Sequence, residues 1–472
     1  MLRARFLAFA ILAAGSRPAF ATAPSDLVPA RWNSTNPKSL TLLAGTPINC
    51  ILLSWSDKEA PALAAFATAA GAKGISPFAI LTPGTDPVTP ARAAVRAHFA
   101  GIVLEGDFPL DVAARLRDAL TDTRTPVVEI SARNHMRLGG AAPILGTYQG
   151  VWPGIQVEAD GAAKAGPSGS AWIDTNSGFL RAARAWGNAT IWLANLPPAK
   201  SVITPERYLQ VIGDAAMTGS RWVIALDDDF WQRLLRSDPA SLKSWGRIGQ
   251  LLQFNESHPE WRAFTPFGKL AIVQGSDDGA LLSGGILDMI AVRHTPVRAI
   301  PPQKLTRESL AGASMTVNVD TDALSPEQRE ILQAYTRAGG TVFTGPPGWK
   351  EAAPRDTGRI TLNDKELKHI DEIWHDMQAL IGRKNLGARL FNVSSMLSNL
   401  MSSPDNKQVI VNLVNYSEYP AEDVTVMLLG KYHHATLFMP DAKTRDLEVY
   451  DNEEGSGVDI SKVPSYATLR LD

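Results

Sequence analysis

The first half of the chain alternates short apolar runs with amphipathic stretches, and this alternation limits the folds that it can adopt. Eight runs have the length and composition of buried strands, at 50–55, 75–81, 101–106, 126–131, 143–148, 171–174, 190–195 and 221–227. Helical patterns lie between most of them, at 61–70, 91–99, 110–120, 178–186 and 204–218. Strands that alternate with helices form parallel sheets, and eight such repeats close into a barrel. We therefore predict an α/β fold class, with a TIM-like (β/α)8 barrel over residues 24–265.

The N-terminus has the pattern of a secretory signal peptide over residues 1–23. Arg3 and Arg5 precede an apolar run at 6–14, and the small-residue ends "AFA" and "ATA" follow it. The run is too short to span a bilayer, and no later stretch approaches the roughly 20 apolar residues that a spanning helix needs. We expect a periplasmic or secreted protein with no membrane span.

Charge and cysteine content exclude some classes of function. Lys and Arg number 46 and Asp and Glu 48, spread along the chain without a basic block, which argues against a nucleic-acid partner. Cys50 is the only cysteine, so there is no internal disulfide. It opens the apolar run "CILLSW", where a small buried hydrophobe is favoured over a nucleophile.

A second unit is expected over residues 266–385. Strands are predicted at 269–276, 297–300, 315–320 and 340–345, with helices near 280–292 and from Ser325, where Ser325 and Gln328 form a capping box. This is a flavodoxin-like, doubly wound layout. It resembles the class I glutamine amidotransferase-like fold, but it contains no cysteine to act as nucleophile. Packing or oligomerisation, as a homo-oligomer through this α/β domain, is favoured over ligand binding at its "GSDDG" and "TGPPG" turns.

The tail contains short runs with the composition of β-strands, separated by turn residues. This pattern predicts a small C-terminal β-sandwich over residues 386–472. His433 and His434 are adjacent and would face opposite sides of a strand, so they do not suggest a metal site. The acids at 227–229 could hold calcium, but their spacing is not that of an EF-hand. We expect no metal and no cofactor.

Acidic residues recur where the barrel strands are predicted to end, which is where active sites of this architecture lie. They are Glu105, Asp107, Glu129, Asp174, Asp227, Asp228 and Asp229. Hydrolysis of a glycosidic bond needs two carboxyl groups, one to protonate the leaving oxygen and one to attack or to activate water. The candidate catalytic acids are Glu105, Glu129, Asp174 and Asp228, with Asp174 and Asp228 foremost because each follows an apolar strand directly.

Each acid also has a structural interpretation. Asp174 and Asp107 could cap the helices that follow them, and Asp229 could be solvated or cap "FWQRLL". Glu129 could be an ion-pair partner inside the barrel.

Aromatic and polar residues beside the same strand ends suit sugar binding, because flat apolar faces stack on pyranose rings. The candidates are Trp55, Tyr148, Trp152 and Trp172, with Asp107, Gln149, Asn176 and Asp227 as polar contacts. A tryptophan in an apolar segment is more often part of the core. Trp152, in the Gly- and Pro-flanked "QGVWPG", is the least core-like of the four.

Barrel, flavodoxin-like unit and β-sandwich in this order resemble the layout of family 42 glycoside hydrolases, the β-galactosidases with a trimerisation domain. The resemblance implies a carbohydrate-active protein. In that family's clan an asparagine precedes the acid/base glutamate at the end of the fourth strand, whereas here Val128 precedes Glu129. An Asn-Glu pair does occur at Asn255 and Glu256, but it ends a helix beyond the eighth strand, and we interpret it as a decoy.

Two hypotheses follow. The first is an exported glycoside hydrolase that cleaves an oligo- or polysaccharide at the barrel mouth. The second is a catalytically silent glycan-binding or scaffold protein of the same architecture, in which the acids are caps and ion pairs.

Overall fold

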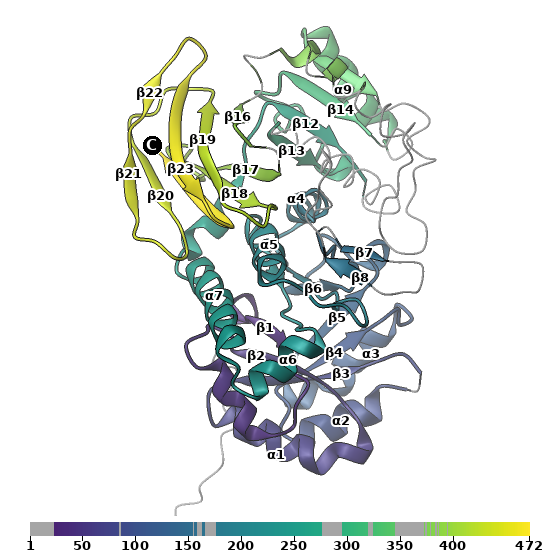
Figure 1. Cartoon of the computed structure of the whole chain (residues 1–472). Coiled ribbons are helices and arrows are strands. Elements are labelled where there is room, and N and C mark those ends of the chain that lie inside the picture. Colours follow the sequence, from purple (N-terminus) through teal and green to yellow (C-terminus); the bar gives the residue numbers. More distant parts are fainter. Residues whose placement is uncertain are drawn as a thin grey trace, which may run out of the picture.

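The structure, a computed structural model, shows three parts joined along one chain. It describes residues 23–84, 86–153, 155–157, 163–165, 176–275, 295–319, 324–344, 372, 375–377, 379–382, 385, 387–393 and 395–472. Figure 1 shows the barrel strands and their helices in the lower half, β12–β14 and α9 at the upper right, and the C-terminal sheets at the upper left. The predicted signal peptide, residues 1–23, lies almost entirely outside the described residues.

Eight parallel strands form the barrel, in the order β1-β2-β3-β4-β5-β6-β9-β10. The sheet closes between its first and last strands, where Ala30 bridges Ile224 and the Arg31 N–H donates to the Ile224 carbonyl at 2.7 Å. The strands are β1 (Pro29–Arg31), β2 (Cys50–Ser54), β3 (Ser76–Leu81), β4 (Gly101–Glu105), β5 (Val127–Ser131), β6 (Ile144–Thr147), β9 (Thr190–Leu193) and β10 (Arg221–Trp222). The predicted fold class is confirmed.

The strand predicted at 171–174 lies outside the described residues, and β6 pairs directly with β9. The eighth place is taken by β1, which the sequence pattern missed because it is only three residues long and begins with Pro29.

The helices that follow the strands cover the outside of the barrel (Figure 1). They are α1 (Ala60–Gly71), α2 (Val88–Arg96), α3 (Val112–Ala119), α4 (Ser177–Trp186), α5 (Pro205–Ala216), α6 (Asp228–Leu235) and α7 (Pro239–Glu256). Alternate strand residues point to opposite faces of the sheet. One set, including Leu52, Phe78, Val103 and Trp192, fills the barrel interior, and the other packs against the helices.

The second part is an open parallel sheet in the order β13-β12-β14-β15, the order expected of a flavodoxin-like unit. Its strands are β12 (Leu270–Val273), β13 (Val297–Ile300), β14 (Met315–Asn318) and β15 (Thr341–Thr344). Helix α9 (Pro326–Arg337) starts at the predicted capping box. The helix predicted at 280–292 lies outside the described residues.

The C-terminal part consists of two antiparallel sheets, as predicted. The six-stranded sheet contains β11 (Thr265–Pro266), β17 (Met396–Ser402), β18 (Val409–Asn415), β24 (Tyr466–Leu471), β20 (Ala435–Phe438) and β21 (Arg445–Leu447). The four-stranded sheet contains β16 (Ala388–Phe391), β19 (Ala421–Leu428), β23 (Ser456–Val463) and β22 (Tyr450–Asp451).

Helix α5 joins the barrel to the C-terminal sheets. The Arg207 guanidinium donates to the Tyr416 carbonyl at 3.1 Å, and the Gln210 amide donates to the Asn415 carbonyl at 3.1 Å. Both side chains are fully buried. Val414 and Tyr466 belong to the same apolar cluster as the barrel's outer core, so the two parts share one hydrophobic interface.

Candidate functional site

A cavity of about 280 Å³ opens at the carboxyl ends of the barrel strands, close to the lower end of the size range of ligand pockets. Its wall comes from the ends of β1, β2 and β3 and from the loops after β9 and β10. The lining residues are Arg31, Trp32, Asn33, Leu52, Ser54, Ile80, 196–201, Leu226, Asp227 and Asp228. This face is the one on which barrels of this class carry their active sites.

Glu105 ends β4 with its carboxylate held by Arg31, which ends β1. Two contacts form, from Arg31 Nη1 to Glu105 Oε2 at 3.0 Å and from Nη2 to Oε1. Arg31 Nη2 also donates to the Ala194 carbonyl after β9 at 3.2 Å. The side chains are 9% and 18% exposed, so this bidentate pair fixes the carboxylate beside the cavity in one orientation.

The three consecutive acids after β10 have three different environments. Asp227 is buried and caps α6: its carboxylate accepts from the Phe230 N–H at 3.0 Å and from the Tyr208 hydroxyl at 2.8 Å. Asp229 is exposed and pairs with Arg233 at 2.8 Å. Asp228 is exposed on the cavity wall, and within the described residues it makes no ion pair or side-chain hydrogen bond. The structure therefore gives the substrate-binding candidate Asp227 a capping role and leaves Asp228 open to a ligand.

A second polar cluster lies at the ends of β4, β5 and β6. The Asp107 carboxylate accepts from the Tyr148 hydroxyl at 2.8 Å and from the Ala132 N–H at 3.1 Å, and it lies 3.1 Å from His135 Nδ1. Partial burial alone would raise the pKa of Asp107, but these hydrogen bonds outweigh it and lower the pKa. Burial and the bond to Asp107 raise the pKa of Tyr148 to about 12. Asp107 thus binds three neighbours and is not the helix cap that the sequence allowed.

The lowered pKa makes a testable link between Asp107 and acid stability. A carboxyl group whose pKa is lower in the folded state stabilises the fold above its unfolded-state pKa, and this contribution disappears as pH falls through the folded-state value. We expect Tyr148→Phe to lower the free energy of unfolding near pH 6, with the difference from wild type vanishing near pH 2. Urea denaturation at both pH values measures it. Tyr419→Phe, at a tyrosine that is 78% exposed, is the control. An equal difference at both pH values would contradict the assignment.

Glu129 points away from the mouth. Its carboxylate accepts from Arg117 Nη2 of α3 at 2.6 Å, and it alternates with Val128 and Ile130, which fill the barrel interior. It is therefore an ion-pair partner on the outer surface of the barrel. This geometry removes it from the set of catalytic candidates.

Two of the predicted sugar contacts are core residues. The Trp152 ring is 4% exposed and packs edge-to-face on Trp222 at 4.9 Å and on Tyr208 at 5.4 Å. Asn176 is fully buried, where its side chain accepts from the Val151 N–H at 2.7 Å and donates to Asp214 at 2.9 Å. Neither side chain is available to a ligand.

The remaining candidates lie at or near the mouth, or outside the described residues. Trp55 is half-buried after β2, where its indole N–H donates to Asp57 at 2.9 Å. Gln149 follows β6 and accepts from the Arg133 N–H at 2.7 Å. Asp174 and Trp172 lie outside the described residues.

The sequence pattern missed several residues of the cavity wall. Arg31 and Asn33 were overlooked because β1 was not recognised. Ser54 ends β2 and Lys200 lies in the loop after β9, and neither belongs to a distinctive motif. The available signal for Arg31 was the stretch "PARWNS", in which the apolar Trp32 lies between Arg31 and polar residues.

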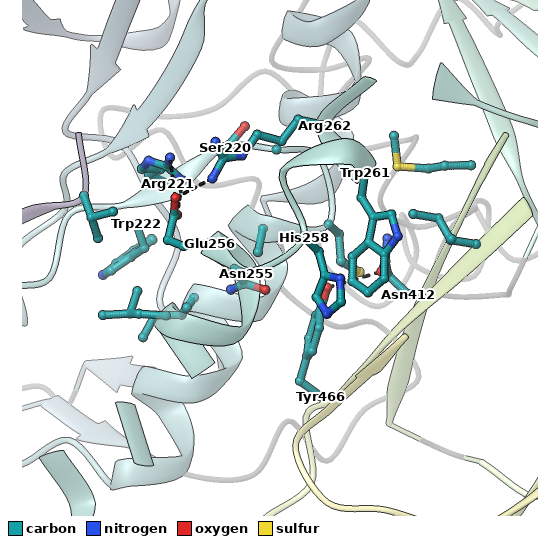
Figure 2. A pocket seen from close by; sticks show the side chains of 18 residues that line it. Ser220, Arg221, Trp222, Asn255, Glu256, His258, Trp261, Arg262, Asn412 and Tyr466 are labelled. Carbon is teal, nitrogen blue, oxygen red and sulfur yellow. Dashed lines mark hydrogen bonds and ion pairs between the residues drawn. The ribbon is translucent and has the colours of Figure 1, made fainter. Parts of the chain in front are cut away.

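A smaller cavity of about 50 Å³ lies on the opposite side of the barrel, between the end of α7, helix η6 (Pro259–Ala263) and the C-terminal sheets. Figure 2 shows Glu256 between Arg221 and Arg262, and the His258 ring facing the Trp261 ring. Glu256 pairs with Arg221 at 2.7 Å, and the two rings stack 3.9 Å apart. The Asn255-Glu256 pair therefore belongs to an interface between parts of the chain and not to the mouth.

The described residues contain no group of three or more His, Cys, Asp or Glu side chains placed to hold a metal ion. None of the helices in this part of the chain has the length and apolar character needed to cross a membrane.

The sequence matches no protein-family model, and no curated protein is significantly similar to it. Among solved structures, α-L-fucosidase isoenzyme 2 from Paenibacillus thiaminolyticus superposes with a TM-score of 0.58 at 10% identity, over 94% of this chain and 99% of that one. A rhamnosidase from a Novosphingobium species (TM-score 0.41, 11% identity, 81% of this chain and 39% of that one) and a β-galactosidase from Marinomonas ef1 (0.35, 11%, 88% and 67%) are too distant to inform the fold. The chain thus shares the fold of a glycoside hydrolase, while the family 42 resemblance stays a prediction.

Proposed function

We propose that the chain is a glycoside hydrolase that acts at the mouth of the barrel. One observation carries the proposal: the cavity at the carboxyl ends of the strands has an open carboxylate, Asp228, on its wall, and Arg31 on the same wall holds a second carboxylate, Glu105. The shared fold with a fucosidase supports the class of reaction and not its substrate. The substrate that we propose is an oligo- or polysaccharide.

The two carboxyl groups suit different roles in glycosidic cleavage. Asp228 has no partner within the described residues and lies exposed on the cavity wall, so its carboxyl group is accessible to the leaving oxygen or to a water molecule beside a bound sugar. Glu105 is fixed by two guanidinium contacts, as is required of a carboxylate that attacks the anomeric carbon or aligns a water molecule. Asn33, Ser54 and Lys200 on the cavity wall supply hydrogen bonds to sugar hydroxyls.

The test is product release from a panel of aryl glycosides and polysaccharides by the wild-type protein and by Asp228→Asn. We expect the wild type to cleave at least one substrate. The variant should lose on the order of 10² to 10⁴-fold in kcat, the usual contribution of a general acid or base. Asp229→Asn is the matched control, because Asp229 is adjacent and exposed but pairs with Arg233. If both variants retain wild-type activity, Asp228 is not catalytic.

A catalytically silent glycan-binding protein is the second candidate. It is favoured by the number of acids at this end of the barrel that already have partners, namely Glu105, Asp107 and Asp227. Saturable binding of a glycan by calorimetry, with no release of product from any substrate of the panel, would establish this function instead.

The cellular setting completes the proposal. We propose that the protein acts after export to the periplasm or beyond, because the N-terminal pattern is that of a signal peptide. The α/β domain, in this view, packs against the barrel or joins copies of the chain.

A further inference from the structure

A cavity of about 680 Å³ lies between the amino-terminal end of the barrel and the α/β domain, on the side opposite the mouth. The barrel contributes the start of β9 and the end of α4, and the α/β domain contributes the end of β13 and helix η7 (Pro302–Lys304). Its volume is within the roughly 300–1,000 Å³ range of small-molecule sites.

The wall of this cavity is positively charged. Arg184, Arg262, Arg298 and Lys304 all line it, and no Asp or Glu is present among the described residues of the wall. Arg184 and Arg262 come from the barrel side, and Arg298 and Lys304 come from the α/β domain. The positive charge is therefore assembled only when the two parts are docked.

Three of these four cations have no acidic partner in the described part of the chain. Arg184 donates to the carbonyls of Thr218 at 3.1 Å and Phe264 at 3.0 Å, Arg298 to that of Ala311 at 3.1 Å, and Lys304 to that of Ala185 at 2.6 Å. Only Arg262 is neutralised, by Glu256 and by Asp26, and its pair with Glu256 is visible in Figure 2.

For Arg184 and Arg298, which are partly buried, the lack of an acidic partner is unfavourable. Burial partly desolvates the charged forms of Arg184 and Arg298 and so lowers their pKa values. Arg298 Nε is also buried without an acceptor. Two other guanidinium groups with little exposure do have carboxylate partners, Arg31 with Glu105 and Arg221 with Glu256. A partly buried charge without a counterion is unfavourable, so this cavity favours an anion from outside the chain.

We propose that the cavity binds a small organic anion whose oxyanion group, a phosphate, sulfate or carboxylate, is held by Arg298 and Lys304. Guanidinium groups bind such groups through paired N–H donors, and an ammonium adds a compact positive charge. Ala185, Ile191 and Pro301 give an apolar surface for the uncharged body of the ligand. A ligand held from both sides stabilises the docking of the α/β domain on the barrel.

The proposal is tested on the full-length mature protein by calorimetry and thermal unfolding with inorganic phosphate, sulfate and glucuronate. Sodium chloride keeps the ionic strength constant, and glucose serves as the uncharged probe. We expect saturable binding of at least one of these anions, together with a higher Tm. The anion that binds most tightly identifies the chemical class of the ligand's oxyanion group. Arg298→Gln and Lys304→Gln should each weaken binding by about tenfold, the loss expected for one charge-assisted hydrogen bond.

Lys73→Gln removes the same charge from an exposed position outside the cavity and should bind as wild type does. Lys304 is itself exposed, so its variant tests the cavity even if Arg298→Gln fails to fold. Binding no stronger than that of chloride, or wild-type affinity in both Arg298→Gln and Lys304→Gln, would overturn the proposal. Neither result depends on whether the mouth of the barrel is catalytic.

Discussion

Glu105→Gln is expected to abolish turnover and to destabilise the barrel at the same time. Loss of a nucleophilic or water-aligning carboxylate lowers kcat by on the order of 10³-fold or more. The same change leaves Arg31 mostly buried and uncompensated, which costs roughly 3 kcal/mol in the free energy of unfolding when one partner of a buried pair is removed. Activity measured on the best substrate of the panel, together with urea denaturation, gives both quantities.

A second variant separates the two effects. Replacing both partners of a buried ion pair by apolar residues is often neutral for stability. Arg31→Met combined with Glu105→Met should therefore recover most of the stability lost in Glu105→Gln, while activity stays absent. Glu129→Gln is the matched control, because it makes the same glutamate-to-glutamine change at a carboxylate that pairs with Arg117 on the outer surface of the barrel. Recovery of activity along with stability in the double variant would show that Glu105 is structural only.

Gly213→Ala is expected to loosen the contact between the barrel and the C-terminal sheets. A Cβ atom at this position of α5 would lie 2.7 Å from Tyr466 Cδ2 and 3.3 Å from Val414 Cγ2. Both neighbours belong to the shared apolar cluster, so the ring has little room to move. We expect a loss of about 1–3 kcal/mol in the free energy of unfolding, which is typical of overpacking. Thermal and urea denaturation measure it.

Helix α7 supplies the matched substitution. At Gly246 a Cβ atom would meet nothing within 4 Å, so Gly246→Ala should raise the free energy of unfolding by about 0.5–1 kcal/mol through helix propensity alone. The same chemical change therefore has opposite signs in two helices. If both variants are stabilised, α5 is not tightly packed against β24.

The strands and helices could be predicted because apolar runs and capping residues are local signals. The runs at 75–81 and 126–131 became β3 and β5 nearly to the residue, and Ser325 caps α9 as its spacing indicated. β1 was missed because three residues carry too little pattern, and its place depends on pairing with β2 and with Ile224.

The site was harder to predict because a barrel strand is apolar on both faces. Glu129 alternates with Val128 and Ile130 along β5, so it faces the side of the strand opposite to theirs. The sequence does not reveal which side faces the helices, and only the contact of Glu129 with Arg117 of α3 settles it. For the acids at 227–229, local sequence cannot reveal that the Tyr208 hydroxyl, on another element, binds Asp227. Glycine and proline around Trp152 suggested exposure, whereas Trp222 and Tyr208 bury it through long-range packing.

The thiol of Cys50, the only cysteine of the chain, can be used to detect opening of the barrel. The thiol is fully buried inside the barrel beside β3, and burial raises its pKa, so the reactive thiolate is suppressed in the folded state. An alkylating reagent can therefore modify the chain only in molecules whose barrel has opened. Each such molecule gains one label, whatever the state of the α/β domain or of the C-terminal sheets. The native chain thus allows barrel opening to be timed without an introduced probe.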